Sequence, residues 1–97
     1  MAQRIYKPDY NEEIRVCDFS TVLDIVDNVS TVSAIIVDKL GTDLSSTMLA
    51  SVVVSGDAKG VKYTLKGGVV NKTYQLAIRA IAQSGQKLEE NFDVRII

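Results

Sequence analysis

Hydrophobic and polar residues alternate with a period of two along much of the chain, a pattern that predicts β-strands. The longest alternating segments are residues 73–83 and 86–97. Ser84 and Gly85 stand between them and predict a two-residue turn, because glycine accepts the positive φ angle of a tight reversal. We therefore expect the last 25 residues to form a β-hairpin.

Shorter strand patterns precede this hairpin, over residues 12–17, 28–38, 48–55 and 61–66. In the first of them Ile14 and Val16 alternate with Glu13 and Arg15, so the two apolar side chains are expected to face a core. The total is six strands, or seven if residues 40–49 contribute another.

The first ten residues are mostly polar and contain the only proline, Pro8. We interpret residues 1–10 as an N-terminal arm outside the core, which leaves residues 11–97 as one folded domain.

A helix-like spacing occurs only in residues 18–27, where Phe19, Leu23 and Val26 follow one another at intervals of three and four. This spacing predicts a short turn or helical cap. Asp18 or Ser20 would accept a free backbone N–H at its start.

The composition favours the same fold class. Thirteen valines and nine isoleucines among 97 residues are β-branched and suit strands better than helices. Short strands separated by turn residues predict an all-β protein, an antiparallel sandwich. Cys17 is the only cysteine, so no disulfide can form within the chain.

Charge is nearly balanced, at −1 for the whole chain, which gives no basic surface of the kind that binds nucleic acid. Its distribution is uneven. Residues 1–57 carry nine acidic and four basic residues, and residues 58–97 carry three acidic and seven basic residues. Two interpretations remain open: solvated strand faces, or an acidic and a basic side suited to head-to-tail packing in a ring.

Candidate chemistry is sparse. The chain has no histidine, so the usual general acid–base group and zinc ligand are missing, and Cys17 has no histidine to activate it. A calcium site from Asp38, Asp43 and Asp57 matches no known loop spacing. We expect no enzyme activity, no cofactor and no metal. No apolar stretch reaches the roughly 20 residues of a membrane-spanning helix, so no membrane contact is expected either.

The segment from Leu65 to Tyr74 resembles the entry to strand F of immunoglobulin-like and fibronectin type III domains. In those folds a tyrosine at the corner directs its hydroxyl back to the backbone of the preceding loop, and Tyr74 fits that position. Gly67, Gly68 and Asn71 form the turn before it. The resemblance implies an immunoglobulin-like sandwich.

A second resemblance covers nearly the whole chain from Tyr6 onward. The residues that carry it are Asp18-Phe19-Ser20, Leu23, Gly41, Gly67-Gly68, Tyr74, Gly85 and Glu90. This pattern is similar to that of the small phage fibre–tail adaptor family, which has an Asp-aromatic-Ser opening and a Gly-Gly-x-x-Gly-x-x-Tyr corner. The chain departs from it by lacking the family's early tryptophans and by placing Asn71 where the third corner glycine is expected.

This resemblance implies a virion structural protein, assembled in the host cytoplasm, that links tail, neck or fibre components in several symmetric copies. The alternative is a monomeric immunoglobulin-like module that recognises protein or carbohydrate. The residues expected to contact neighbours lie in the arm, on the outer side of the strand at 73–83 and at the chain end: Ile5, Tyr6, Pro8, Tyr10, Ala77, Ile81 and Ile97.

Overall fold

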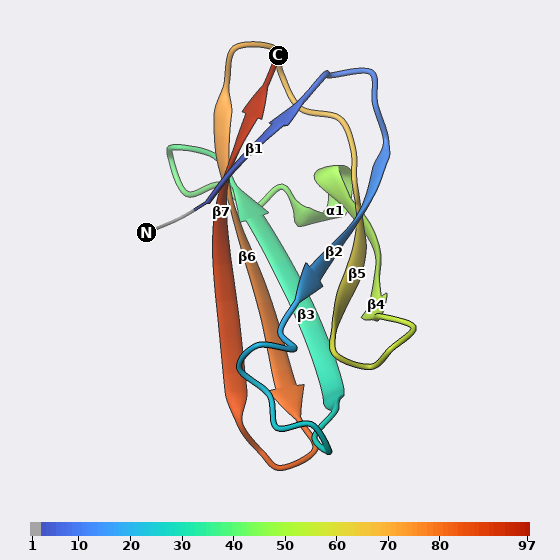
Figure 1. The fold of residues 1–97 in the computed structure, drawn as a ribbon. Coiled ribbons are helices and arrows are strands. Elements are labelled where there is room, and N and C mark those ends of the chain that lie inside the picture. Colours follow the sequence, from blue (N-terminus) through green and yellow to red (C-terminus); the bar gives the residue numbers. More distant parts are fainter. Residues whose placement is uncertain (1–2) are drawn as a thin grey trace.

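A computed structural model describes residues 3–97 as two packed β-sheets with one short helix (Figure 1). The elements are β1 (Gln3–Lys7), β2 (Glu13–Asp18), β3 (Val29–Val37), α1 (Ser45–Met48), β4 (Leu49–Val54), β5 (Gly60–Leu65), β6 (Thr73–Ala82) and β7 (Lys87–Ile96). One sheet has the order β1-β7-β6-β3 and the other the order β2-β5-β4. The expected all-β sandwich is confirmed.

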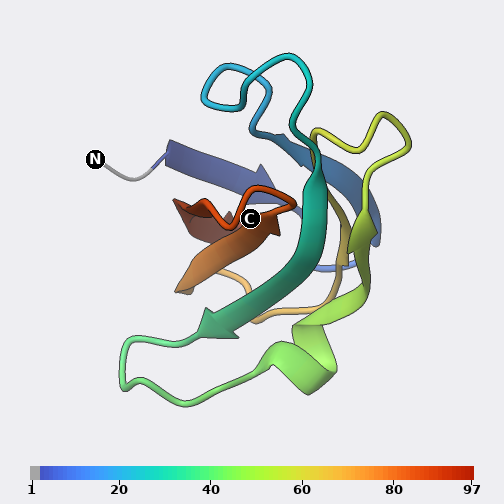
Figure 2. The same ribbon diagram turned by 90° about the horizontal axis from the view of Figure 1, so that it is seen from below.

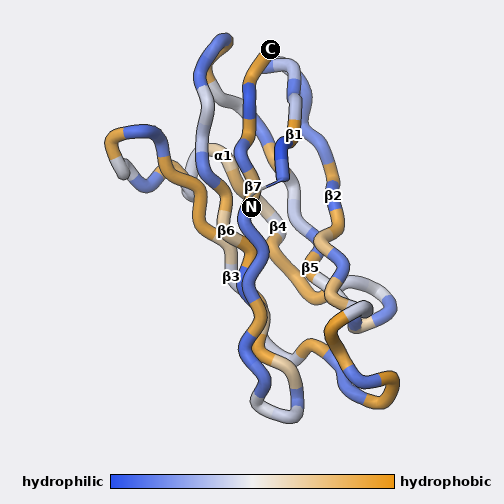
Figure 3. Tube along the Cα trace, turned by 60° about the vertical axis from the view of Figure 1, so that its left-hand side comes forward, coloured by the Kyte–Doolittle hydropathy of each residue, from blue (hydrophilic) through white to orange (hydrophobic). Residues whose placement is uncertain are grey.

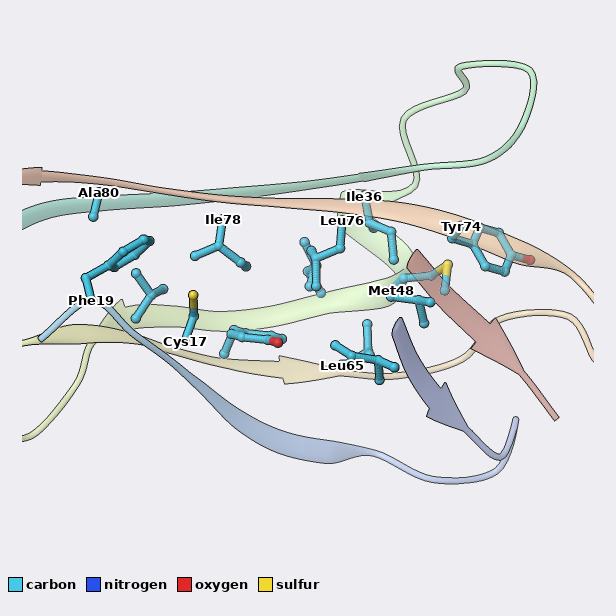
Figure 4. Close-up of a cluster of buried hydrophobic side chains, with 14 of the residues drawn as sticks. Cys17, Phe19, Ile36, Met48, Leu65, Tyr74, Leu76, Ile78 and Ala80 are labelled. Carbon is cyan, nitrogen blue, oxygen red and sulfur yellow. The ribbon is translucent and has the colours of Figure 1, made fainter. Parts of the chain in front are cut away.

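The core lies between the inner faces of these sheets. Ile36, Leu76 and Ile78 from the four-stranded sheet are almost completely buried, and they belong to one core cluster with Val61 and Leu65 of the three-stranded sheet. Figure 4 shows Leu65 on the opposite side of this layer from Leu76. Alternate residues of each strand point into this layer, as in sandwiches whose sheets pack face to face. The period-two pattern of residues 73–82 is therefore a burial pattern, with every second side chain buried along β6.

The expectation of an unpaired arm is wrong for residues 3–7. These residues form β1, which pairs in parallel with Phe92–Ile96 of β7 (Figure 1). Ile5 is buried in the core cluster, and only Pro8, Asp9 and Tyr10 lie beyond the strand. A five-residue strand with one apolar core residue has too short a pattern to stand out in the sequence. Met1 and Ala2, the first two residues of the expected arm, lie outside the described residues.

Residues 3–97 form seven strands, as the upper count expected, but the additional strand is β1 and not residues 40–49. That region instead contains a turn and the four-residue helix α1 (Ser45–Met48), which buries Met48. Asp43 forms an isolated bridge with Val37. The Ser45 hydroxyl accepts a hydrogen bond from the Ile36 N–H at 3.0 Å. A side chain thus pairs with one backbone N–H on the free edge of β3.

The face of β2 is opposite to the expected one. Cys17 and, just beyond the strand, Phe19 are buried, whereas Ile14 and Val16 are 68% and 57% exposed. Alternate residues of a strand share a face, so burial of the odd positions directs the even positions outward. Arg15 lies on the same face of β2 as Cys17, near the start of the strand, and forms an ion pair with Glu13 at 2.8 Å.

The two loops at one end of the sandwich compare differently with expectation. Residues 19–28 contain the expected short turn: the N–H groups of Val22 and Leu23 bond to the Phe19 carbonyl, and the Asp18 carboxylate accepts a hydrogen bond from the Ser20 N–H at 2.8 Å. Val26 is exposed. The β6–β7 hairpin is one residue longer than expected. The Ala82 carbonyl accepts from the Gly85 N–H, and the Ala82 N–H donates to Gln86, which leaves Gly85 in the positive-φ position of a three-residue loop.

Candidate interaction surfaces

The corner before β6 is built around Tyr74, which is 3% exposed (Figure 4). Its hydroxyl oxygen accepts a hydrogen bond from the Val69 N–H at 3.0 Å. The contact between the tyrosine hydroxyl and the backbone of the preceding loop is the one that the resemblance to immunoglobulin-like domains implies, and in it the hydroxyl is the acceptor. The loop between the two sheets is therefore tied to the buried ring.

Gly68 and Asn71 of the corner turn both have positive φ angles. Gly68 has a φ of 98°, and a Cβ atom there would lie 2.7 Å from Cγ1 of Ile96, so only glycine fits against the last strand. Asn71 has a φ of 69°, a region that asparagine tolerates. Its N–H donates to the Ile96 carbonyl at 2.8 Å. Leu65, at the end of β5, is fully buried beneath this turn.

Lys7 ties β1 to the same corner. Its side chain is fully buried, and its Nζ donates to the carbonyls of Pro8 and Gly67 at 2.8 Å and to that of Asp9 at 3.4 Å. Burial lowers the pKa of this ammonium group. Lys7 was not anticipated as a structural residue, because a lysine in a polar segment gives no sign that the distant carbonyl of Gly67 will meet those of Pro8 and Asp9 around its ammonium group.

The seven residues expected to contact neighbours do not form one site. Ile5 is buried and unavailable, and Pro8 is half-buried. Tyr6 and Tyr10 are 55% and 93% exposed. Ile97 is exposed beside them, since its N–H bonds to the Lys7 carbonyl.

Ala77 and Ile81 lie on the outer face of the four-stranded sheet, away from this end. Ala77 is paired with Ile35 of β3 and Asn91 of β7 across the sheet. A hollow of about 200 Å³ lies over this row. Its apolar floor and polar rim, which includes Asp93, form a shallow surface and not an enclosed site.

Two exposed apolar surfaces were not anticipated. The first is the outer face of the three-stranded sheet, where Val16 and Val53 flank Lys62 in one row and Ile14 lies in the next. All three apolar side chains are roughly half exposed or more. This surface exists because β2 buries the face opposite to the expected one. A period-two pattern shows that a strand has two different faces but does not show which of them is buried.

The second surface is the tip of the β2–β3 loop, where Ile25 and Val26 are 92% and 85% exposed. Hydropathy colouring shows hydrophobic segments in this loop (Figure 3). The β4–β5 loop lies beside it (Figure 2), and Lys59 from that loop donates its Nζ to the carbonyls of Ile25 and Asp27. From the β6–β7 hairpin, the Ser84 hydroxyl donates to Asp27 Oδ2 at 2.6 Å.

The aspartates considered for metal binding are separated. Asp38 follows the end of β3, whereas Asp57 precedes Ala58, whose carbonyl bonds to Val29 at the start of β3. Asp38, Asp43 and Asp57 each accept hydrogen bonds from backbone N–H groups of their own loops. Within residues 3–97, no three His, Cys, Asp or Glu side chains are grouped closely enough to hold a metal ion.

Cys17 is 5% exposed and lies in the core beneath Ile78 (Figure 4). Burial raises the pKa of its thiol to about 11, so the nucleophilic thiolate is scarce at neutral pH.

The sequence matches no protein-family model and no curated protein. Among the described residues, no helix is both long and apolar enough to cross a membrane.

Proposed function

We propose that this chain is a non-enzymatic structural adaptor of a bacteriophage virion, which joins tail or neck components and acts in several symmetric copies. The observation that carries the proposal is that the exposed apolar side chains of this domain point in several directions. Among residues 3–97, large hydrophobic side chains are exposed on both sheet faces and at both ends of one small sandwich. A domain that binds a single ligand concentrates such side chains in one pocket, whereas a connecting domain needs them on several sides.

An immunoglobulin-like assignment of the sandwich supports the resemblance on which this role rests. In chain order β2 to β7 are divided between the sheets as strands B to G of such domains are, with β2, β4 and β5 in one sheet and β3, β6 and β7 in the other. Tyr74 occupies the corner at the start of the F-like strand. The one difference is β1, which joins the sheet of β7 instead of the sheet of β2.

The surroundings of the acidic groups are consistent with a scaffold. The carboxylates of Asp18, Asp38 and Asp57 accept hydrogen bonds from backbone N–H groups of their own loops. Glu89 forms an ion pair with Arg79. Such contacts are typical of structural carboxylates.

Light scattering of the purified chain, from micromolar to millimolar concentration, tests the multi-copy part of the proposal. We expect a defined assembly, and a monomer at every concentration would favour the alternative recognition module. The pair Ile14→Thr and Val16→Thr should weaken association while leaving the fold intact, since both side chains are exposed. Thr31→Ser, an exposed position on the outer face of the other sheet, is the matched control.

Deletion of the first ten residues is not a clean test of an arm, because it removes β1 together with the buried Ile5 and Lys7. The role in a virion is tested by electron microscopy of the particle at a resolution that traces chains. Absence of this chain from the particle would overturn the proposal.

A further inference from the structure

The two ends of the sandwich carry different features, a projecting apolar loop tip at one end and a groove at the other. At one end Ile25 and Val26 project from the β2–β3 loop, and we call these two residues the apolar knob. At the other end a groove of about 220 Å³ lies between the β3–α1 loop and the β5–β6 loop, and we call it the corner groove. Thr73, the first residue of β6, lines the corner groove, whereas the hairpin after Ala82 contacts the loop of the knob.

The apolar knob is held in place from below and from both sides. Phe19 and Leu23 of the same loop are buried in the core beneath it. Lys59 holds the carbonyl of Ile25 at 3.0 Å, and the carboxylate of Asp27 accepts hydrogen bonds from the side chain and the backbone of Ser84. A knob fixed in this way loses little conformational freedom when it binds, so the burial of its apolar area is available for affinity.

The corner groove has apolar walls and a basic rim. Its walls include Leu40, which is 91% exposed, and the buried ring of Tyr74. Lys39 and Lys72 also line it, and within residues 3–97 neither side chain forms a hydrogen bond or ion pair. The carboxylate of Asp38, which lies there too, accepts hydrogen bonds from the N–H groups of its own loop.

Three charged residues lie next to the apolar knob: Asp24 and Asp27, which flank it in the chain, and Lys59, whose ammonium group is already bound to the carbonyls of Ile25 and Asp27. Asp24 precedes Ile25, is exposed, and forms no side-chain hydrogen bond or ion pair in the described part of the chain. Asp27 follows Val26 and is already bound to Ser84. An apolar knob beside a free carboxylate therefore suits a groove with an apolar wall and two free lysines.

We propose that copies of this chain associate end to end, with Ile25 and Val26 of one copy in the corner groove of the next and Asp24 facing Lys39 and Lys72. The inference rests on the proposed multi-copy function and names the partner of two of its surfaces. Because the knob and the groove belong to opposite ends, the contact is heterologous. It generates a ring if the rotation between copies closes, and a filament if it does not.

Charge reversal tests the contact. Asp24→Lys and Lys72→Glu should each weaken self-association about tenfold, because each places like charges together at the rim. The double variant restores an opposite-charge pair between positions 24 and 72, while Lys39 still faces the new lysine, so it should recover part of the wild-type association and associate more strongly than either single variant. Ser33→Lys, an exposed charge change on the outer face of β3, is the control and should have little effect. Circular dichroism of each variant verifies the fold.

Cross-linking tests the geometry. In a Cys17→Ala background, Val26→Cys mixed with Leu40→Cys should form a disulfide-linked dimer under mild oxidation, and neither variant alone should do so. Cross-linking of Val26→Cys with itself would show an isologous contact and overturn the inference.

The outcomes also separate the two proposals. An assembling wild-type chain whose charge variants assemble equally well would refute the knob-and-groove contact and leave the adaptor role standing. Several symmetric copies in the particle that do not touch through the knob and the groove would refute the contact alone, whereas absence from the particle would refute the adaptor role.

Discussion

The backbone N–H of Val69 donates a hydrogen bond to the hydroxyl oxygen of Tyr74 at 3.0 Å, across the loop that carries the chain from one sheet to the other. The ring beneath this bond packs in the core, so the loop is positioned by a residue that the hydrophobic layer already holds. The corner groove lies beside this tyrosine, which links the stability of the corner to the shape of a proposed contact.

Replacement of Tyr74 by Phe removes the acceptor and leaves the Val69 N–H without its partner. We expect the free energy of unfolding to fall by about 1–2 kcal/mol, as measured by denaturant titration. Tyr10→Phe is the control, because Tyr10 is 93% exposed and should contribute almost nothing. Equal stability of Tyr74→Phe and the wild type would mean that the hydrogen bond does not hold the corner.

Lys7→Met keeps a long side chain in the buried position but leaves the carbonyls of Pro8, Asp9 and Gly67 without their shared donor. We expect a loss of about 2–3 kcal/mol, since the donor is charged and the site is closed to water. Lys72→Met, at an exposed lysine, should change stability by less than about 0.5 kcal/mol. Similar values for the two variants would contradict a structural role for Lys7.

The pKa of Asp27 should lie below that of an ordinary aspartate, because the Ser84 hydroxyl donates a hydrogen bond to its carboxylate. A depressed folded-state pKa means that the carboxylate stabilises the fold above the ordinary aspartate pKa, and that this contribution is lost as pH falls through the folded value. Carbon-detected NMR titration measures the pKa of the Asp27 carboxyl directly. Ser84→Ala should raise the pKa of Asp27 toward its ordinary value, and an unchanged value would argue against the tether between the loops.

Cys17 should react slowly with thiol reagents at pH 8, because its pKa is raised to about 11 and its sulfur is buried. Denaturant should restore a normal rate. The matched control is Val16→Cys in a Cys17→Ala background, which places a thiol on the exposed face of the same strand. Native Cys17 reacting as fast as this control would show that β2 presents its other face to the core.

The residues of the last hairpin show how far sequence reasoning reaches. Alternation over residues 73–83 and 86–97 predicts the pairing of β6 with β7, because both partners lie close in the chain and a turn joins them. Gly68, Asn71 and Tyr74 likewise lie within one short corner, so the glycines indicate the turn and the resemblance to immunoglobulin-like domains implies the tyrosine contact.

The class of the fold follows from composition and patterning, since β-branched residues and period-two alternation leave few options other than strands packed in two layers. Long-range packing establishes that residues 3–7 pair with β7, that β2 turns Ile14 and Val16 outward, and that Lys7 is buried beside Gly67. It also brought Asp27 and Ser84, 57 positions apart, to one end of the molecule. The reason is physical: alternation specifies two faces for each strand, but which face is buried, and which strand lies beside it, depends on contacts between residues far apart in the chain.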